Sequence, residues 1–337
     1  MKLRPVVALA VAASVSLIAH AGGASAQTWA TPAQYTTNFA RVINTDVASS
    51  VRLPSGAELF LGGDVTAVNG ASAVGYYGYP HDAFITESAR GSASFTVVHG
   101  HYGTDYVNGV ATPGAQWQQV PNFSNGDYMW FSGALVDGGT LYIYGEEVQG
   151  LGTVQGEAMA KFNAKTLAYE STKVWTSGNG DASGWSSSIA VQGGHYLVGM
   201  NSPTCVYATN CTGDFAFVPA GQEMNPAAWT ITTSVFPQSA GLGNQISVTA
   251  AASGGYLAYA KNCDVCGNGS PILELSAANI TGPWTATGRT WATSAPSGAS
   301  TYSVQAHPDD SAPGTLLISY AVNGGGQYHP NFLAVTP

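Results

Sequence analysis

Segments of small or polar residues alternate with strongly apolar segments along most of the chain. The recurring unit is a strand of small or polar residues, a turn that contains glycine, and a second strand of apolar or aromatic residues. Its five copies begin at Asp46, Trp130, Trp185, Gln245 and Tyr302, and their turn glycines are Gly56, Gly139, Gly194, Gly255 and Gly314. These glycines are separated by 83, 55, 61 and 59 residues. A four-stranded unit that repeats radially is a β-propeller. The sequence therefore predicts an all-β protein, a five-bladed β-propeller, with a β-sandwich or a β-helix as the alternative.

The interval between the first two turn glycines, Gly56 and Gly139, is about twenty residues longer than the others. This predicts an insertion, an excursion of the chain from the first blade, between Asp64 and Trp130. The residues before the first copy have no partner within the repeat. We expect the segment 28–38 to supply a closing strand beside the last blade.

The composition supports an all-β protein and excludes several classes of function. Charged residues make up 9% of the chain, against about 25% in an average protein, which argues against coiled coils and charged helical bundles. The net charge of −9 repels phosphate backbones, so nucleic acid is not an expected partner.

The amino terminus has the pattern of a secretory signal peptide. Lys2 and Arg4 precede an apolar run over 6–19, and Ala24-Ser25-Ala26 supplies the small residues of a cleavage site. We expect a signal peptide over 1–26 and a single secreted propeller domain over 27–337, with no membrane attachment after cleavage. An uncleaved anchor is the alternative.

The four cysteines form two local pairs, Cys205 with Cys211 and Cys263 with Cys266. In an exported protein such pairs predict two disulfides that close loops. Zinc held by two cysteines from each loop is the alternative.

Four carboxylates are the candidate catalytic residues. Three aspartates lie in or near the first copy and one glutamate ends the second strand of the second copy: Asp46, Asp64, Asp82 and Glu147. The inner strands of a propeller converge on one axis, so acids distant in sequence can meet there. Two carboxyl groups suffice to cleave a glycosidic bond. Capping of turns is the competing role for each aspartate, and Glu146 competes with Glu147 for the inward position.

Aromatic and histidine side chains near these acids are candidate sugar contacts. We select His81, Trp130, Trp185 and His307 as substrate-binding residues, because sugar rings stack on aromatic faces; burial in the core is the alternative for each. The chain has no G-x-S-x-G elbow, H-E-x-x-H motif or phosphate-binding loop, so carboxylate chemistry is the simplest catalytic option.

Several short motifs resemble a family of secreted five-bladed propellers long catalogued as domains of unknown function. The stretch from Thr45-Asp46-Val47 to Gly62-Gly63-Asp64 resembles the opening of the first blade, Gly282-Pro283-Trp284 is similar to a turn common in such propellers, and Ala306-His307-Pro308 looks like part of the closing blade. Some members degrade D-arabinan, and the architecture is similar to that of arabinanases and fructosidases. Val65 stands where the family often has Thr, and His81-Asp82 where it often has Asn-Ser.

The resemblance implies a glycoside hydrolase that acts on a neutral polysaccharide, with an arabinan-like furanoside favoured. The expected partner is a polysaccharide or oligosaccharide, and the expected state is a monomer. No metal ligand set or cofactor is assigned, although the resemblance makes structural calcium near His307 an option. A non-catalytic carbohydrate-binding propeller at the cell surface is the second hypothesis, and a structural or adhesion protein is the third.

Overall fold

The computed structural model of the 337-residue chain describes residues 27–46, 49–69, 71–72, 80–98, 100, 105–107, 110–112, 118–150, 153–175, 185–201, 212–233, 235–237, 242–243, 245–262, 266–267 and 270–337. The expected signal peptide, Cys205, Cys211 and Cys263 lie outside these residues. No helix in the described ranges combines the length and the apolar character needed to cross a membrane.

Most of the described chain forms five antiparallel four-stranded sheets. The first sheet contains β2 (Ser49–Arg52), β3 (Glu58–Gly62), β6 (Ala83–Glu87) and β7 (Phe95–Val98). The second contains β10 (Tyr128–Asp137), β11 (Thr140–Gln149), β12 (Thr153–Asn163) and β13 (Tyr169–Trp175). The third contains β14 (Trp185–Val191), β15 (Gly194–Asn201), β16 (Thr212–Pro219) and β17 (Thr230–Thr232). The fourth contains β18 (Ile246–Ala250), β19 (Tyr256–Lys261), β21 (Pro271–Ala277) and β22 (Thr285–Ala292). The fifth contains β23 (Ser300–His307), β24 (Leu316–Gly324), β25 (Gln327–Val335) and β20 (Cys266–Gly267), which comes from the fourth blade.

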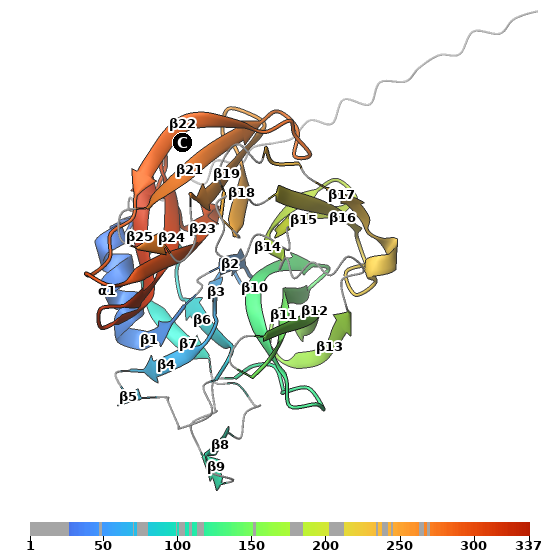
Figure 1. The fold of residues 1–337 in the computed structure, drawn as a ribbon, viewed down its shortest axis with the longest axis vertical. Helices are drawn as coiled ribbons and strands as arrows, with labels where there is room; N and C mark the ends of the chain where they lie inside the picture. Colours follow the sequence, from blue (N-terminus) through green and yellow to red (C-terminus); the bar gives the residue numbers. More distant parts are fainter. Residues whose placement is uncertain are drawn as a thin grey trace, which may run out of the picture.

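The sheets are arranged as blades around one axis (Figure 1). The first strands of the five sheets, β2, β10, β14, β18 and β23, each contact the next, and β23 contacts β2 to close the ring. These are the first strands of the five sequence repeats. The prediction of a five-bladed β-propeller is confirmed.

Serine hydroxyls explain why the inner strands are rich in small polar residues. An inner strand leaves one edge of its backbone unpaired, and the neighbouring blade supplies the missing partners. Ser186 Oγ donates to Ile246 O at 2.7 Å and accepts from Ile246 N at 3.2 Å, and Ser187 Oγ accepts from Val248 N at 3.0 Å. Because these contacts advance together along both strands, neighbouring inner strands run in the same direction. Their first residues therefore lie at one end of the channel, called the entrance below, and their last residues at the other, the far end.

The predicted closing strand over 28–38 is wrong, because this region contains helix α1 (Pro32–Val42). Thr31 caps the helix and forms a capping box with Gln34, and Pro32 has the fixed φ that suits the first helical turn. The segment does lie beside the last blade, as expected: Tyr35 and Phe39 pack against Phe332 of β25. The position of the segment was predicted from the repeat alone, without the helix-capping pattern of Thr31, Pro32 and Gln34.

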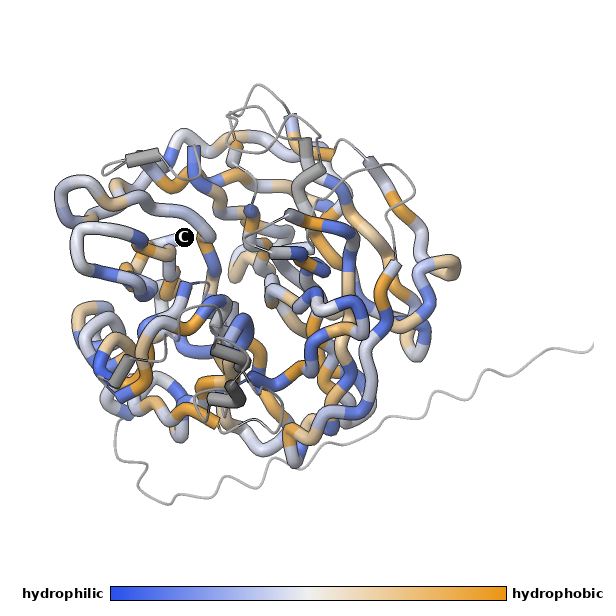
Figure 2. The backbone as a smooth tube through the Cα atoms, turned by 60° about the horizontal axis from the view of Figure 1, so that its bottom comes forward, coloured by the Kyte–Doolittle hydropathy of each residue, from blue (hydrophilic) through white to orange (hydrophobic). Residues whose placement is uncertain are grey.

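The excursion from the first blade includes a small sheet beside the ring. Strand β4 (Val65–Val68) pairs with β1 (Ile43–Thr45) and with β5 (Ala71–Ser72), and a further hairpin joins β8 (Asp105–Val107) and β9 (Val110–Thr112). The described residues also include two short 3₁₀ turns, η2 (Pro226–Ala228) and η4 (Pro308–Asp310). Hydrophobic and hydrophilic segments are interspersed around the whole ring (Figure 2).

Candidate functional site

Two of the predicted catalytic acids meet at the entrance of the channel. Thr45 is paired with Val65 in the β1–β4 ladder, so the next residues, Asp46 and Asp64, face each other just beyond its end. Gly63 N donates to Asp46 O at 3.1 Å. A Cβ atom at Gly63 would collide with Oδ1 of Asp46, so glycine allows this close approach.

The Asp46 carboxyl is held by two tyrosines of the last blade. Tyr302 of β23 donates to Asp46 Oδ2 at 3.1 Å, and Tyr328 of β25 also donates to the carboxyl. Burial, together with the charge of Asp64, raises the pKa of Asp46 to about 7, although both tyrosine hydrogen bonds act to lower it. A carboxyl group with such a pKa can donate or accept a proton near neutral pH.

The carboxylate of Asp64 is oriented by contacts with two ring nitrogens, one from His81 and one from Trp130. Its Oδ1 lies 2.8 Å from Nδ1 of His81 and accepts from Nε1 of Trp130 at 2.9 Å. The His81 ring stacks on Tyr128 with ring centroids 3.4 Å apart and an interplanar angle of 11°. The structure thus brings His81 and Trp130, both predicted as sugar contacts, to Asp64.

A cavity of about 530 Å³ opens beside this pair of acids. Asp64 and Tyr328 line it together with polar groups that include Asn44, Thr66 and Asn323. Its size is within the range of small-molecule sites, which is about 300–1,000 Å³. The site thus has a carboxyl pair with aromatic side chains beside it, and a cavity next to Asp64 with space for a sugar ring.

Asp82 does not join the pair, contrary to the expectation that it faces the entrance with Asp46 and Asp64. Its side chain is fully buried, and Oδ1 accepts hydrogen bonds from the backbone N–H groups of Gln119 and Val120. Burial raises the pKa of Asp82 to about 8. These contacts let Asp82 fix the segment that leads into the second blade.

The side chain of Glu147 is hydrogen-bonded to Asn125, in the segment just before the second blade. Its Oε1 accepts from Asn125 Nδ2 at 3.3 Å, and the same amide donates to Asp127 at 2.8 Å. Glu147 is paired with Met129, whereas Glu146 is paired with Trp130. Directly opposite residues share a face of the sheet, so Glu146 is on the face of Trp130, the residue that contacts Asp64.

The other two predicted sugar contacts lie in the core, and their expected placement at the site was wrong. Trp185 is 6% exposed and packs edge-on against Trp229 between the second and third blades. His307 is fully buried, with Nδ1 2.8 Å from Ser50 Oγ and Nε2 2.8 Å from Ser319 Oγ. Burial lowers the pKa of His307 to about 3. Both ring nitrogens are occupied, which leaves neither to bind calcium.

The sequence analysis missed Tyr128 and Tyr328, which complete the aromatic surroundings of the acids. Tyr328 lies two residues after Gly324-Gly325-Gly326, which span the β24–β25 turn, a pattern that indicates a hairpin but not its position. Tyr128 precedes Trp130 by two residues in β10, so alternation along the strand was the available signal.

Solved structures of other proteins have a fold similar to that of this chain. No family model matches the chain, and no curated protein matches it in sequence. A protein from Bacteroides ovatus has a similar structure (TM-score 0.62, 13% identity, 89% of this chain and 88% of that one). A GH43_1 enzyme from Xanthomonas citri in complex with xylotriose is also similar (TM-score 0.56, 15% identity, 90% and 92%). So is a GH43 β-xylosidase/α-arabinofuranosidase from a compost metagenome (TM-score 0.54, 11% identity, 88% and 91%). The chain therefore shares the fold of five-bladed GH43 glycoside hydrolases.

Proposed function

We propose that this protein is a secreted glycoside hydrolase that acts on a neutral polysaccharide, with an arabinan-like furanoside favoured. The observation that carries the proposal is the Asp46–Asp64 pair at the entrance, where burial and Asp64 raise the pKa of Asp46 to about 7. The structural neighbours include a GH43 enzyme with xylotriose bound, which supports a saccharide substrate.

In this mechanism Asp46 donates a proton to the leaving glycosidic oxygen, and Asp64 is the second carboxylate. His81 and Trp130 hold Asp64 in one orientation, and Tyr302 holds Asp46. The products are two saccharides, with the elements of water added across the cleaved bond. Glu146 is a further candidate for substrate contact, because it shares a face with Trp130.

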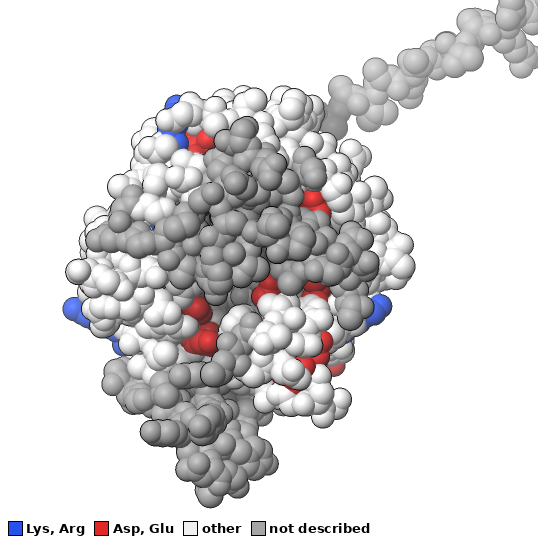
Figure 3. Space-filling model, in the orientation of Figure 1, with Lys and Arg blue, Asp and Glu red and all other residues white. Residues whose placement is uncertain are grey.

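The charge distribution suits an uncharged polymer. Figure 3 shows one face of the ring, on which acidic side chains gather toward the middle and lysine and arginine lie at the rim. An anionic polysaccharide would be repelled from such a surface.

The test is product release from arabinan, xylan and β-1,3-galactan, measured by anion-exchange chromatography. We expect hydrolysis of at least one of them, and a fall in kcat of about a hundredfold or more in Asp46→Asn and in Asp64→Asn. Asp309→Asn is the matched control, because Asp309 lines the far end of the channel and its variant should keep wild-type activity. If Asp46 is the proton donor, kcat/KM should decrease as the pH rises above about 7.

Full activity in both Asn variants would overturn the assignment of the acids. Saccharide binding with no hydrolysis of any substrate would instead favour a carbohydrate-binding propeller.

A further inference from the structure

A group of side chains that could bind a metal ion lies at the far end of the channel, away from the entrance acids. Asp137 is the last residue of β10, His195 is the second residue of β15, and Glu223 is in the turn that follows β16. One potential ligand atom from each residue lies within 4.8 Å of the other two. The group therefore joins the second blade to the third.

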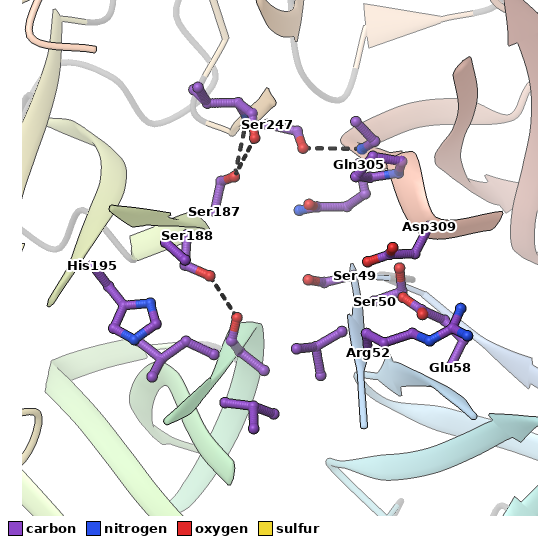
Figure 4. A pocket seen from close by; sticks show the side chains of 18 of the residues that line it. Ser49, Ser50, Arg52, Glu58, Ser187, Ser188, His195, Ser247, Gln305 and Asp309 are labelled. Atoms are coloured by element: carbon purple, nitrogen blue, oxygen red, sulfur yellow. Dashed lines mark hydrogen bonds between the residues drawn. The ribbon is translucent and has the colours of Figure 1, made fainter. Parts of the chain in front are cut away.

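The histidine of this group, His195, is buried at the edge of the channel cavity. Its side chain is 8% exposed, yet neither ring nitrogen makes a hydrogen bond or an ion pair with the residues that the structure describes. Burial lowers its pKa, although the charges of Asp137 and Glu223 act to raise it. The ring lies at the edge of the channel cavity of about 260 Å³ shown in Figure 4.

The charge of the two carboxylates is the next feature of this group. Within the described part of the chain, neither Asp137 nor Glu223 is ion-paired with a lysine or arginine. Glu223 is 1% exposed, and its Oε1 accepts from Gly221 N at 3.0 Å. A cation bound between two carboxylates this close would reduce their mutual repulsion.

We propose that Asp137, His195 and Glu223 bind one divalent transition-metal ion of the zinc type. A doubly charged ion would balance the two carboxylates, and one imidazole with two carboxylates is a donor set that suits Zn²⁺ better than Ca²⁺ or Mg²⁺. The cavity beside His195 has room for a water molecule as the fourth ligand. Tyr142 hydrogen-bonds to Glu223 and would orient that carboxylate.

The position of the group predicts a structural role. The three residues come from hairpin and turn segments of two blades, beside the apolar cluster that includes Leu135, Trp229 and Met224. A bound ion would hold these blades together at the far end of the channel.

The test is titration of the EDTA-treated full chain with ZnCl₂, followed by calorimetry and thermal unfolding. We expect one Zn²⁺ per chain, and a rise in Tm of about 5 °C when free Zn²⁺ is about 100 times its Kd. Ca²⁺ and Mg²⁺ should cause no comparable rise. Co²⁺ should give visible absorption bands typical of four-coordinate sites.

Two variants and two controls make the result specific. His195→Gln and Asp137→Asn should each reduce Zn²⁺ affinity at least tenfold and abolish the Co²⁺ bands. His329→Gln is the matched histidine control, because His329 is also 8% exposed. Glu170→Gln removes a carboxylate of the second blade that is paired with Lys161 at 3.0 Å. Both controls should bind Zn²⁺ as the wild type does.

Asp137→Asn keeps the test decisive if His195→Gln does not fold, because Asp137 is only half-buried. Unchanged Zn²⁺ affinity in the folded ligand variants, or no binding by the wild type, would overturn the proposal.

Discussion

The seam between the first and fifth blades differs in chemistry from the seam between the third and fourth. The third–fourth seam is filled by apolar and aromatic side chains, among them Phe215, Phe236 and Trp284. The first–fifth seam, where the ring closes, also has an aromatic cluster but contains buried acids and a buried histidine, including Glu58, Glu87, Asp310 and His307. The same architecture is thus stabilised by two kinds of contact, and only one of them depends on pH.

The buried acids of the closing seam lie close enough to affect one another. Burial, with the charge of Glu58 and the carboxyl of Glu87, raises the pKa of Asp310 to about 10. Burial also raises the pKa of Glu58 to about 8, although Ser50 and Arg52 act to lower it. Because these raised pKa values keep Asp310 and Glu58 mainly protonated near neutral pH, the seam carries less unpaired negative charge.

The largest effect on stability is expected at the apolar seam. Phe215 is fully buried, with its ring centroid 5.5 Å from that of Phe236 and 6.2 Å from that of Trp284. Phe215→Ala should lower the free energy of unfolding by about 3–5 kcal/mol, measured by chemical denaturation. The loss should be equal at pH 5 and pH 8, because no titratable group is removed. A loss that changes with pH would contradict the claim that the stability of the third–fourth seam does not depend on pH.

The second effect is the pH dependence of the closing seam. Asp310 and Glu58 have raised pKa values in the folded state, so their contribution is complete below about pH 4 and is lost as the pH rises. The free energy of unfolding should fall on the order of 2–4 kcal/mol between pH 5 and pH 8. Asp310→Asn, which is neutral at every pH, should make this dependence shallower. A flat wild-type profile would show that these acids are ionised in the folded protein.

His307 should change stability in the opposite direction with pH. Its pKa is lowered to about 3, so its contribution is complete above about pH 6.5 and is lost as the pH falls toward 3. His307→Gln can restore only part of the hydrogen bonding to Ser50 and Ser319, which should cost about 1–3 kcal/mol at pH 7. The cost should be smaller at pH 4, where the wild type has lost part of its advantage. A larger cost at pH 4 would contradict a neutral buried imidazole.

The smallest effect is expected at helix α1, which lies against the closing blade. Thr31→Ala removes the hydroxyl that accepts from Gln34 N at 3.3 Å and should cost about 1 kcal/mol. Thr31→Ser keeps the hydroxyl and is the control. Equal losses in both variants would mean that the cap does not contribute.

The entrance site was only partly predictable. Asp46 and Asp64 were found because few acids occur in the chain and both flank strands of the first repeat. Their juxtaposition depends on the β1–β4 ladder, which no local pattern indicated. Asp82 has the same residue type in an equally aromatic segment, yet its carboxyl binds backbone N–H groups, a partner that sequence does not specify.

The sequence by itself determined the number of blades and the polar character of the inner strands. Both follow from local requirements: each repeat needs a turn glycine and an apolar second strand, and each inner strand needs hydroxyls such as those of Ser186 and Ser187 to satisfy its neighbour. Only the tertiary structure decided which acids meet, that α1 rather than a strand packs beside the last blade, and that Asp137, His195 and Glu223 come together. These outcomes depend on contacts between residues far apart in the chain, where the pairing of blades, and not local periodicity, sets the distances.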